Sequence, residues 1–154
     1  MAVNLDFAGR AYPPTEPYAV PATRIAAFAE AVGATHPIHH DAEAAQARGY
    51  ADVVASPTFA VVLAQETEAQ YIADPEAGID FDRVVHGEQR FTHHTAIVGG
   101  DEVIATLHVD TVRPAGGHTM VTTRTELNRP GGDPLSTVIS MIVVRGSQEQ
   151  EGHE

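Results

Sequence analysis

The spacing of apolar positions changes about halfway along the chain, from a helical period to an alternating one. Apolar residues recur at helical spacing through residues 25–32, and Gly33 follows them as a typical C-terminal cap. From residue 83 onward, apolar and polar residues alternate with a period of about two, which is typical of half-buried strands. The pattern therefore predicts helices first and a β-sheet afterwards.

Three helices are predicted, at residues 21–32, 42–48 and 57–71. Asp41 can cap the second helix through its side chain, and Gly49 ends it. The third helix begins at Ser56-Pro57, where a serine can cap the helix and a proline suits its first position. Its early residues are apolar enough for a buried central helix.

Five strands are predicted, at residues 18–20, 84–94, 102–113, 118–128 and 135–145. Turns rich in glycine and proline at 114–117 and 129–134 separate the last three, which indicates an antiparallel meander of the four long strands. Residues 138–144 are apolar on both faces, which indicates an interior strand. These elements predict one α+β domain over residues 1–145 and a polar tail at 146–154, without singling out one α+β fold.

Composition and charge exclude several classes of function. The formal net charge is −12 with neutral histidines, and a field of this sign repels nucleic acids and anionic membranes, so neither is expected as a partner. The absence of cysteine excludes disulfides, thiolate metal sites and a cysteine nucleophile. No apolar run of membrane-spanning length and no secretory leader are found, so a cytoplasmic location is expected.

Several motifs resemble the MaoC-like family of (R)-specific enoyl-thioester hydratases and dehydratases. The segment Gly33-Ala-Thr-His-Pro-Ile-His39 is similar to the family motif Gly-Asp-x-Asn-Pro-(Ile/Leu)-His. Val54-Ala-Ser-Pro-Thr-Phe59 is similar to the start of the family's central helix, and Val84-Val-His-Gly to a following strand. The resemblance runs from about residue 7 to residue 145. Within the family, the chain resembles the HadA-like subunits of actinobacterial (3R)-hydroxyacyl-carrier-protein dehydratases.

The resemblance implies a hot-dog fold, in which an antiparallel sheet wraps around a central helix. It also implies a homodimer, or a heterodimer with a second hot-dog dehydratase chain. Family members act on the C2–C3 bond of an acyl-CoA or acyl-carrier-protein thioester, with an Asp and a His five residues apart. His39 matches the family His as the catalytic residue, whereas Ala34 leaves the Asp position vacant and His36 replaces the usual Asn. Loss of such an acid or base typically lowers the rate about 10²–10⁴-fold.

The missing Asp leaves three interpretations open. In the first, the chain is the substrate-binding subunit of a hydro-lyase: it supplies the wall and tunnel for the acyl chain, and a partner chain supplies the Asp and the His. Alternatively, it is a homodimeric enzyme in which His39, helped by His36 or His40, adds water or another nucleophile to an enoyl thioester. In the third interpretation it is a non-catalytic module that binds acyl thioesters. The negative charge disfavours docking of an acidic carrier protein unless the partner supplies a basic surface.

The expected substrate-binding residues come from three places: the motif loop, the start of the central helix and one strand. They are His36, Ser56, Thr58, Phe59, Val62, His86 and Gln89. N–H groups at a helix start favour a developing oxyanion, and since Pro57 has none, Thr58 and Phe59 would have to donate. Plainer interpretations are that Ser56 is an ordinary helix cap, that Phe59 and Val62 belong to the core, and that His86 and Gln89 define the fold.

Clustered histidines at 36, 39 and 40 and at 93 and 94 raise the question of a metal site, since imidazoles suit zinc. The first group lies in a loop with a proline, and His93 and His94 are expected to face opposite sides of a strand, so no metal is expected. The chain has no phosphate-binding glycine loop and no Gly-x-Ser-x-Gly motif. The carrier thioester of the substrate is therefore the only cofactor-like group expected.

Overall fold

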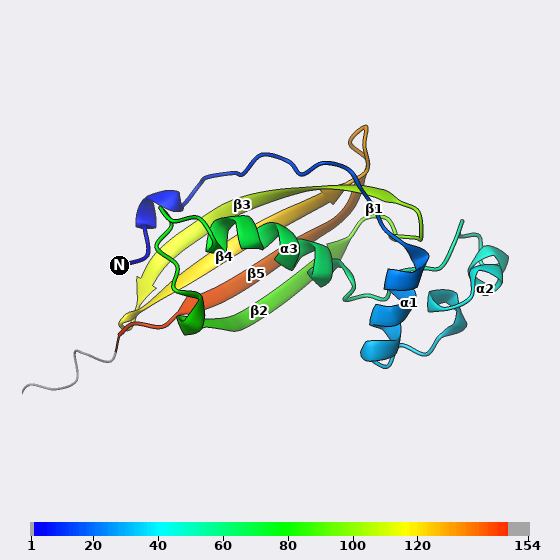
Figure 1. The fold of residues 1–154 in the computed structure, drawn as a ribbon, viewed down its shortest axis with the longest axis horizontal. Helices are drawn as coiled ribbons and strands as arrows, with labels where there is room; N and C mark the ends of the chain where they lie inside the picture. Colours follow the sequence, from blue (N-terminus) through cyan, green and yellow to red (C-terminus); the bar gives the residue numbers. More distant parts are fainter. Residues whose placement is uncertain (1, 148–154) are drawn as a thin grey trace, which may run out of the picture.

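The structure, a computed structural model, describes residues 2–147 and contains one five-stranded antiparallel sheet (Figure 1). Its strands are β1 (Tyr18–Ala19), β2 (Val84–His93), β3 (Glu102–Ala115), β4 (His118–Asn128) and β5 (Pro134–Val144). All five predicted strands are present, with ends that differ by at most two residues. Residues 148–154 of the predicted tail lie outside the described part of the chain.

The helices lie mostly before the sheet, as the period of the sequence predicts. They are η1 (Leu5–Phe7), α1 (Ala22–Ala31), η2 (Pro37–His39), α2 (Ala42–Ala47), α3 (Ala60–Ile72) and η3 (Phe81–Arg83), where η marks a 3₁₀ helix. Asp41 caps α2 as predicted, because its side chain accepts from the Glu43 N–H at 3.0 Å. Within residues 2–147 no helix has the length and apolar character needed to cross a membrane.

Helix α3 lies along one face of the curved sheet (Figure 1). Its buried residues recur every three or four positions and form one stripe: Ala60, Leu63, Ala64, Thr67, Glu68 and Tyr71. The sheet presents every second residue to this helix, and in β3 these are Val103, Ala105, Leu107 and Val109. Removing each large apolar side chain of this contact from water stabilises the fold by about 1.5–3 kcal/mol.

The strand order differs from the predicted meander. Strands β3, β4 and β5 follow one another as hairpins, as expected, but β2 pairs with β5 on the far side of the sheet from β3. The register joins Val84 to Val144 and His93 to Ser136. The prediction of a four-strand meander is thus wrong for β2, because alternation shows which face of a strand is buried and not which strand lies beside it. Strand β5 has neighbours on both sides, as predicted.

A β-bulge at Gly87 interrupts the pairing of β2 with β5 between His86 and Glu88. A Cβ atom at Gly87 would lie 2.9 Å from the Met141 Cε and 3.3 Å from the Met141 carbonyl oxygen. Glycine therefore allows the two strands to approach at the point where the register shifts.

Helix α3 begins at Ala60, three residues later than predicted, and Ser56 does not cap it. Residues 57–59 form a turn, in which the Val61 N–H bonds to the Thr58 carbonyl at 3.1 Å. An α-helix would instead use the Pro57 carbonyl for this bond, but the His93 Nε2 lies 2.7 Å from that oxygen. The imidazole thus hydrogen-bonds to the carbonyl that an α-helical first turn would use.

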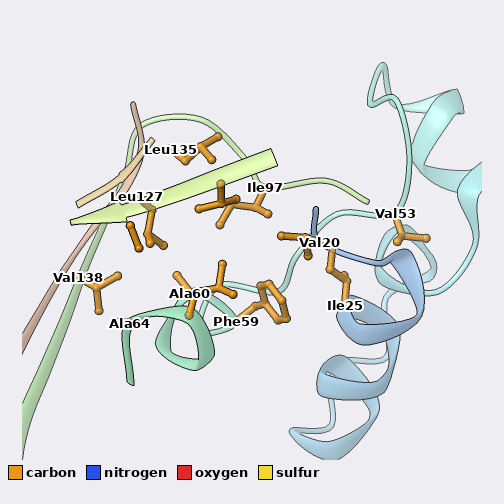
Figure 2. Close-up of a cluster of buried hydrophobic side chains, with 13 residues drawn as sticks. Val20, Ile25, Val53, Phe59, Ala60, Ala64, Ile97, Leu127, Leu135 and Val138 are labelled. Atoms are coloured by element: carbon orange, nitrogen blue, oxygen red, sulfur yellow. The ribbon is translucent and has the colours of Figure 1, made fainter. Parts of the chain in front are cut away.

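The N-terminal end of α3 packs into the larger apolar core (Figure 2). Phe59 is fully buried there, and its ring meets that of Phe28 edge to face with centroids 5.6 Å apart. Figure 2 shows Phe59 on the side of this cluster that faces Ile25 of α1. Val62 is partly buried against the same cluster. Of the two interpretations of Phe59 and Val62, the structure supports the plain core.

The substitution Phe59→Ala is expected to lower the free energy of unfolding by about 3–5 kcal/mol, because it leaves a cavity in this core. Urea denaturation measures the loss. Phe81→Ala is the matched control, since Phe81 is 68% exposed and its truncation should change stability by no more than about 0.5 kcal/mol. Equal effects of the two substitutions would contradict a core role for Phe59.

Candidate functional site

The loop that carries His39 is fixed by hydrogen bonds on both sides of the motif. Helix α1 ends at Ala31, and Gly33 follows it with a φ of +74°, which lets the Ala34 N–H donate to the Ala29 carbonyl at 2.8 Å. The 3₁₀ helix η2 follows, and the His36 Nδ1 caps it by accepting from the Ile38 N–H at 3.2 Å. These hydrogen bonds hold the motif loop in place between α1 and α2.

His39 is the last residue of η2 in this loop and is 9% exposed. Its Nδ1 is 2.6 Å from the carbonyl oxygen of Val54, and the Val54 N–H donates to the Ile38 carbonyl at 2.8 Å. A carbonyl can only accept, so the Nδ1 must carry the proton, and the neutral ring keeps its lone pair on Nε2. No partner for the Nε2 is found among the described residues, which leaves it available as a base.

His39 faces a cavity of about 480 Å³ at the N-terminal end of α3. The walls come from the motif loop, the segment before α3, the first residue of α3 and the segment that follows β2. The lining residues are His36, Ile38, His39, Val54, Ala55, Ser56, Pro57, Ala60, His93, His94, Thr95, Ala96 and Ile97. Of the predicted site residues, the cavity therefore brings together His36, His39 and Ser56, and it does not include Thr58, Phe59, Val62, His86 or Gln89.

Ser56 contributes a hydroxyl group to the cavity. The residue is 3% exposed, and its Oγ has no hydrogen-bond partner among the described residues. An unpaired buried hydroxyl is unfavourable, so this oxygen suits a polar ligand. Of the two predicted N–H donors nearby, that of Phe59 already donates to the Ser56 carbonyl at 3.0 Å, whereas no acceptor is found in residues 2–147 for that of Thr58.

His93 ties the segment before α3 to the sheet, a role that the sequence did not reveal. Its Nε2 donates to the Pro57 carbonyl at 2.7 Å, and its Nδ1 lies 2.7 Å from the Ser136 Oγ on β5. The neutral ring therefore carries its proton on Nε2, the opposite tautomer to His39. His93 thus acts on the cavity wall as a positioning residue.

His94 reaches the other face of β5, as expected for neighbouring residues at the end of a strand. Its Nε2 is 3.1 Å from the Thr137 Oγ1, which donates to Glu126 at 2.6 Å. Burial opposes ionisation of Glu126, but the hydrogen bonds from Thr137 and Arg124 outweigh it and lower the pKa of that carboxyl. Glu126 is therefore an ion-paired carboxylate and lies outside the lining of the cavity.

The cavity has a base but no carboxyl group. None of its lining residues is an Asp or a Glu, and within residues 2–147 no three His, Asp or Glu side chains are grouped as metal ligands. Ala34, at the position of the expected Asp, does not line the cavity, and its carbonyl accepts from the exposed His40 at 2.7 Å. The chain by itself therefore supplies a proton acceptor without a carboxylic acid beside it.

His86 lines a different cavity, of about 600 Å³, between the C-terminal half of α3 and strands β2 and β5. Glu68 from α3 shares this cavity and is 5% exposed. Burial raises the pKa of Glu68, although the nearby His86 opposes the rise. Gln89 donates to the Ile139 carbonyl at 3.0 Å and is outside the lining of both cavities. Sequence reasoning missed Glu68 because a glutamate in a polar helical stretch is usually exposed.

The two imidazoles at the first cavity are expected to show opposite tautomers. In ¹⁵N NMR spectra at about pH 8, where histidines are mostly neutral, His39 should carry its proton on Nδ1 and His93 on Nε2. The reason is that each of these nitrogens faces a carbonyl oxygen. A proton on Nε2 of His39 would contradict the assignment of this atom as a base.

The raised pKa of Glu68 predicts a pH-dependent effect of Glu68→Gln. Above the usual pKa of a glutamate, the unfolded chain loses this proton while the folded chain keeps it, so folding of the wild type weakens as pH rises. The glutamine does not titrate. The stability of Glu68→Gln relative to wild type should therefore increase as the pH rises above the usual glutamate pKa of about 4.3, as measured by urea denaturation. Glu30→Gln, an exposed position on α1, is the control, and a flat profile for Glu68→Gln would contradict the burial of a neutral acid.

Comparison with known proteins shows to which family the chain belongs. Residues 6–138 match the family model for the FAS1-like dehydratase domain region. A UPF0336 protein of Leifsonia xyli subsp. xyli is 51% identical over 146 residues, which are 95% of this chain and 98% of that protein.

Solved structures that are similar to this chain include dehydratases. The truncated HadBC (3R-hydroxyacyl-ACP dehydratase) complex of Mycobacterium tuberculosis superposes with a TM-score of 0.80 and 27% identity, over 90% of this chain and 97% of that chain. A MaoC-like dehydratase gives a TM-score of 0.84 and 28% identity, over 93% of this chain and 43% of that chain. These likenesses confirm the hot-dog fold and the resemblance to MaoC-like dehydratases. The chain therefore belongs to the family of FAS1-like dehydratase domains.

Proposed function

We propose that the chain is the acyl-thioester-binding subunit of a (3R)-3-hydroxyacyl-thioester dehydratase or enoyl-thioester hydratase, and that a second hot-dog chain supplies the missing carboxyl group. The observation that carries the proposal is the composition of the His39 cavity. It holds a buried imidazole and an unpaired serine hydroxyl, but no Asp or Glu lines it. Membership of the dehydratase family supports the class of reaction.

Dehydration of a 3-hydroxyacyl thioester needs a base, an acid and a donor to the thioester carbonyl. His39 Nε2 takes the C2 proton, and the electrons of that C–H bond form the C2–C3 double bond. The C3–O bond breaks, and the hydroxyl leaves as water with a proton from the acid. The Ser56 hydroxyl, which lines the cavity, donates to the carbonyl oxygen on which negative charge develops. Only the acid has no counterpart in the cavity of this chain.

A two-chain arrangement has support from relatives and from charge. HadBC is a (3R)-hydroxyacyl-ACP dehydratase complex, which supports a partner chain for this protein. The net charge of −12 opposes an acidic carrier protein and equally the phosphates of CoA, so a basic docking surface for either would come from the partner. The partner thus supplies the acid and the docking surface.

A homodimeric enzyme is the second candidate, and the position of His36 favours it. Because the His36 Nδ1 accepts from a backbone N–H, its neutral ring carries the proton on Nε2 and can donate it. His36 lines the same cavity as His39, whereas His40 bonds to the Ala34 carbonyl and does not line it. In this candidate His36 replaces the missing acid. The third candidate, a module that binds thioesters without turnover, needs neither histidine to react.

Restoring the acid tests the proposal. Ala34→Asp in the chain alone should raise the rate of hydration of a medium-chain trans-2-enoyl-CoA by about 10²-fold or more, followed by loss of the conjugated enoyl absorbance. Ala34→Asn, which has the same shape without the acid, should stay at the wild-type level. The double variant Ala34→Asp with His39→Ala should also stay there, because the base is then missing.

The three candidate functions predict different patterns of turnover for the wild type and these variants. Wild-type turnover that matches Ala34→Asp and is lost in His36→Ala would overturn the proposal in favour of the homodimeric enzyme. Binding of the enoyl-CoA without turnover by wild type or Ala34→Asp would favour the binding module.

A further inference from the structure

The second cavity is separate from the one at His39. It lies between the C-terminal half of α3 and strands β2 and β5, which run side by side in the sheet (Figure 1). The two cavities have no lining residue in common. Most of its wall is apolar and includes Ile72, Phe81, Val84 and Ile142. Its volume of about 600 Å³ is in the range of small-molecule sites.

Glu68 is the buried acid of this cavity. Its side chain belongs to the buried stripe of α3, it is 5% exposed, and its Oε1 has no hydrogen-bond partner among the described residues. An ionised carboxylate in such a place would be very unfavourable, and burial indeed raises the pKa of Glu68. A neutral carboxyl group can both donate and accept one hydrogen bond from a ligand.

The His86 and Ser140 side chains, which also line this cavity, have hydrogen-bond partners within the protein. The His86 Nε2 lies 3.1 Å from the Glu88 carbonyl oxygen and 3.5 Å from the Ser140 Oγ. Since a carbonyl only accepts, the neutral His86 ring donates from Nε2. Glu68 is therefore the lining residue of this cavity whose buried polar atom has no partner in residues 2–147.

We propose that this cavity binds an acyl chain that carries a neutral hydroxyl or keto group away from its thioester end, and that Glu68 hydrogen-bonds to that group. The apolar walls suit the methylene groups of the chain, and one polar group satisfies the carboxyl. A plain alkyl chain would leave the carboxyl unpaired, which typically weakens binding about 10-fold. An ammonium group would require an ionised Glu68, and an anionic group would be repelled by the net charge of −12.

The choice of an acyl chain rests on the proposed thioester function, but the binding site itself does not. A test without a thioester separates the two. The probes are methyl 10-hydroxydecanoate and methyl decanoate, which differ only in the terminal hydroxyl. Methyl NMR signals of Ile72, Val84 and Ile142 report occupancy of this cavity, and those of Ile38 and Ile97 report occupancy of the His39 cavity.

The hydroxylated ester is expected to shift the signals of the Glu68 cavity and to bind wild type about 5–10-fold more tightly than methyl decanoate. Glu68→Gln keeps a neutral hydrogen-bonding group and should keep the preference. Glu68→Met has a similar size without such a group and should lose it. Glu66→Gln, an exposed position on the same helix, should behave as wild type, and ¹H–¹⁵N spectra of each variant verify the fold.

Equal affinity of the two esters for wild type would overturn the role of Glu68. Shifts confined to Ile38 and Ile97, or no shifts at saturating ester, would overturn the site itself. Ester binding is measured without any turnover by Ala34→Asp. The two experiments therefore distinguish a failure of the proposed function from a failure of the Glu68 site.

Discussion

The burial of α3 against the sheet is the interaction on which the other features depend. Apolar positions of its stripe, such as Leu63 and Tyr71, are buried by the strands, and the polar Thr67 in the same stripe donates to the Leu63 carbonyl at 2.7 Å. A 13-residue helix would be only marginally stable alone in water. Both cavities lie at the margins of this contact, one at the first residue of α3 and one along its second half. Each site therefore exists only while the helix is docked.

The sequence predicts well what depends on local spacing. Alternation, apolar runs and turn residues located all five strands, and the cap at Asp41 and the glycine at position 33 placed the ends of the helices around the motif loop. These features follow from a few neighbouring residues, so a single sequence contains the information. The resemblance to a known family, and not local spacing, placed His36, His39 and Ser56 in one expected site, and all three line one cavity of the structure.

What the sequence does not predict depends on contacts between distant segments. His93 bonds to a residue 43 positions away on β5 and to one 36 positions away before α3, and neither contact follows from alternation. The late start of α3 was missed as well: the Val61 N–H bonds to the Thr58 carbonyl, and the Pro57 carbonyl accepts from the distant His93. Thr58 and Phe59 were expected to bind the substrate, but neither lines the cavity at His39, and the Phe59 N–H donates within the turn before α3.

The strand order has a consequence for how the chain folds. Strand β2 is the first long strand to be synthesised, yet its partner in the sheet is the last one, with Val84 beside Val144. The hairpins of β3, β4 and β5 can form locally, but β2 must wait until β5 exists. Pairing across such a sequence separation is slow compared with hairpin formation, because the intervening loop must close first. During synthesis, the apolar stripe of α3 therefore stays partly uncovered until the end of the domain leaves the ribosome, which gives chaperones or an assembling subunit an interval in which to bind.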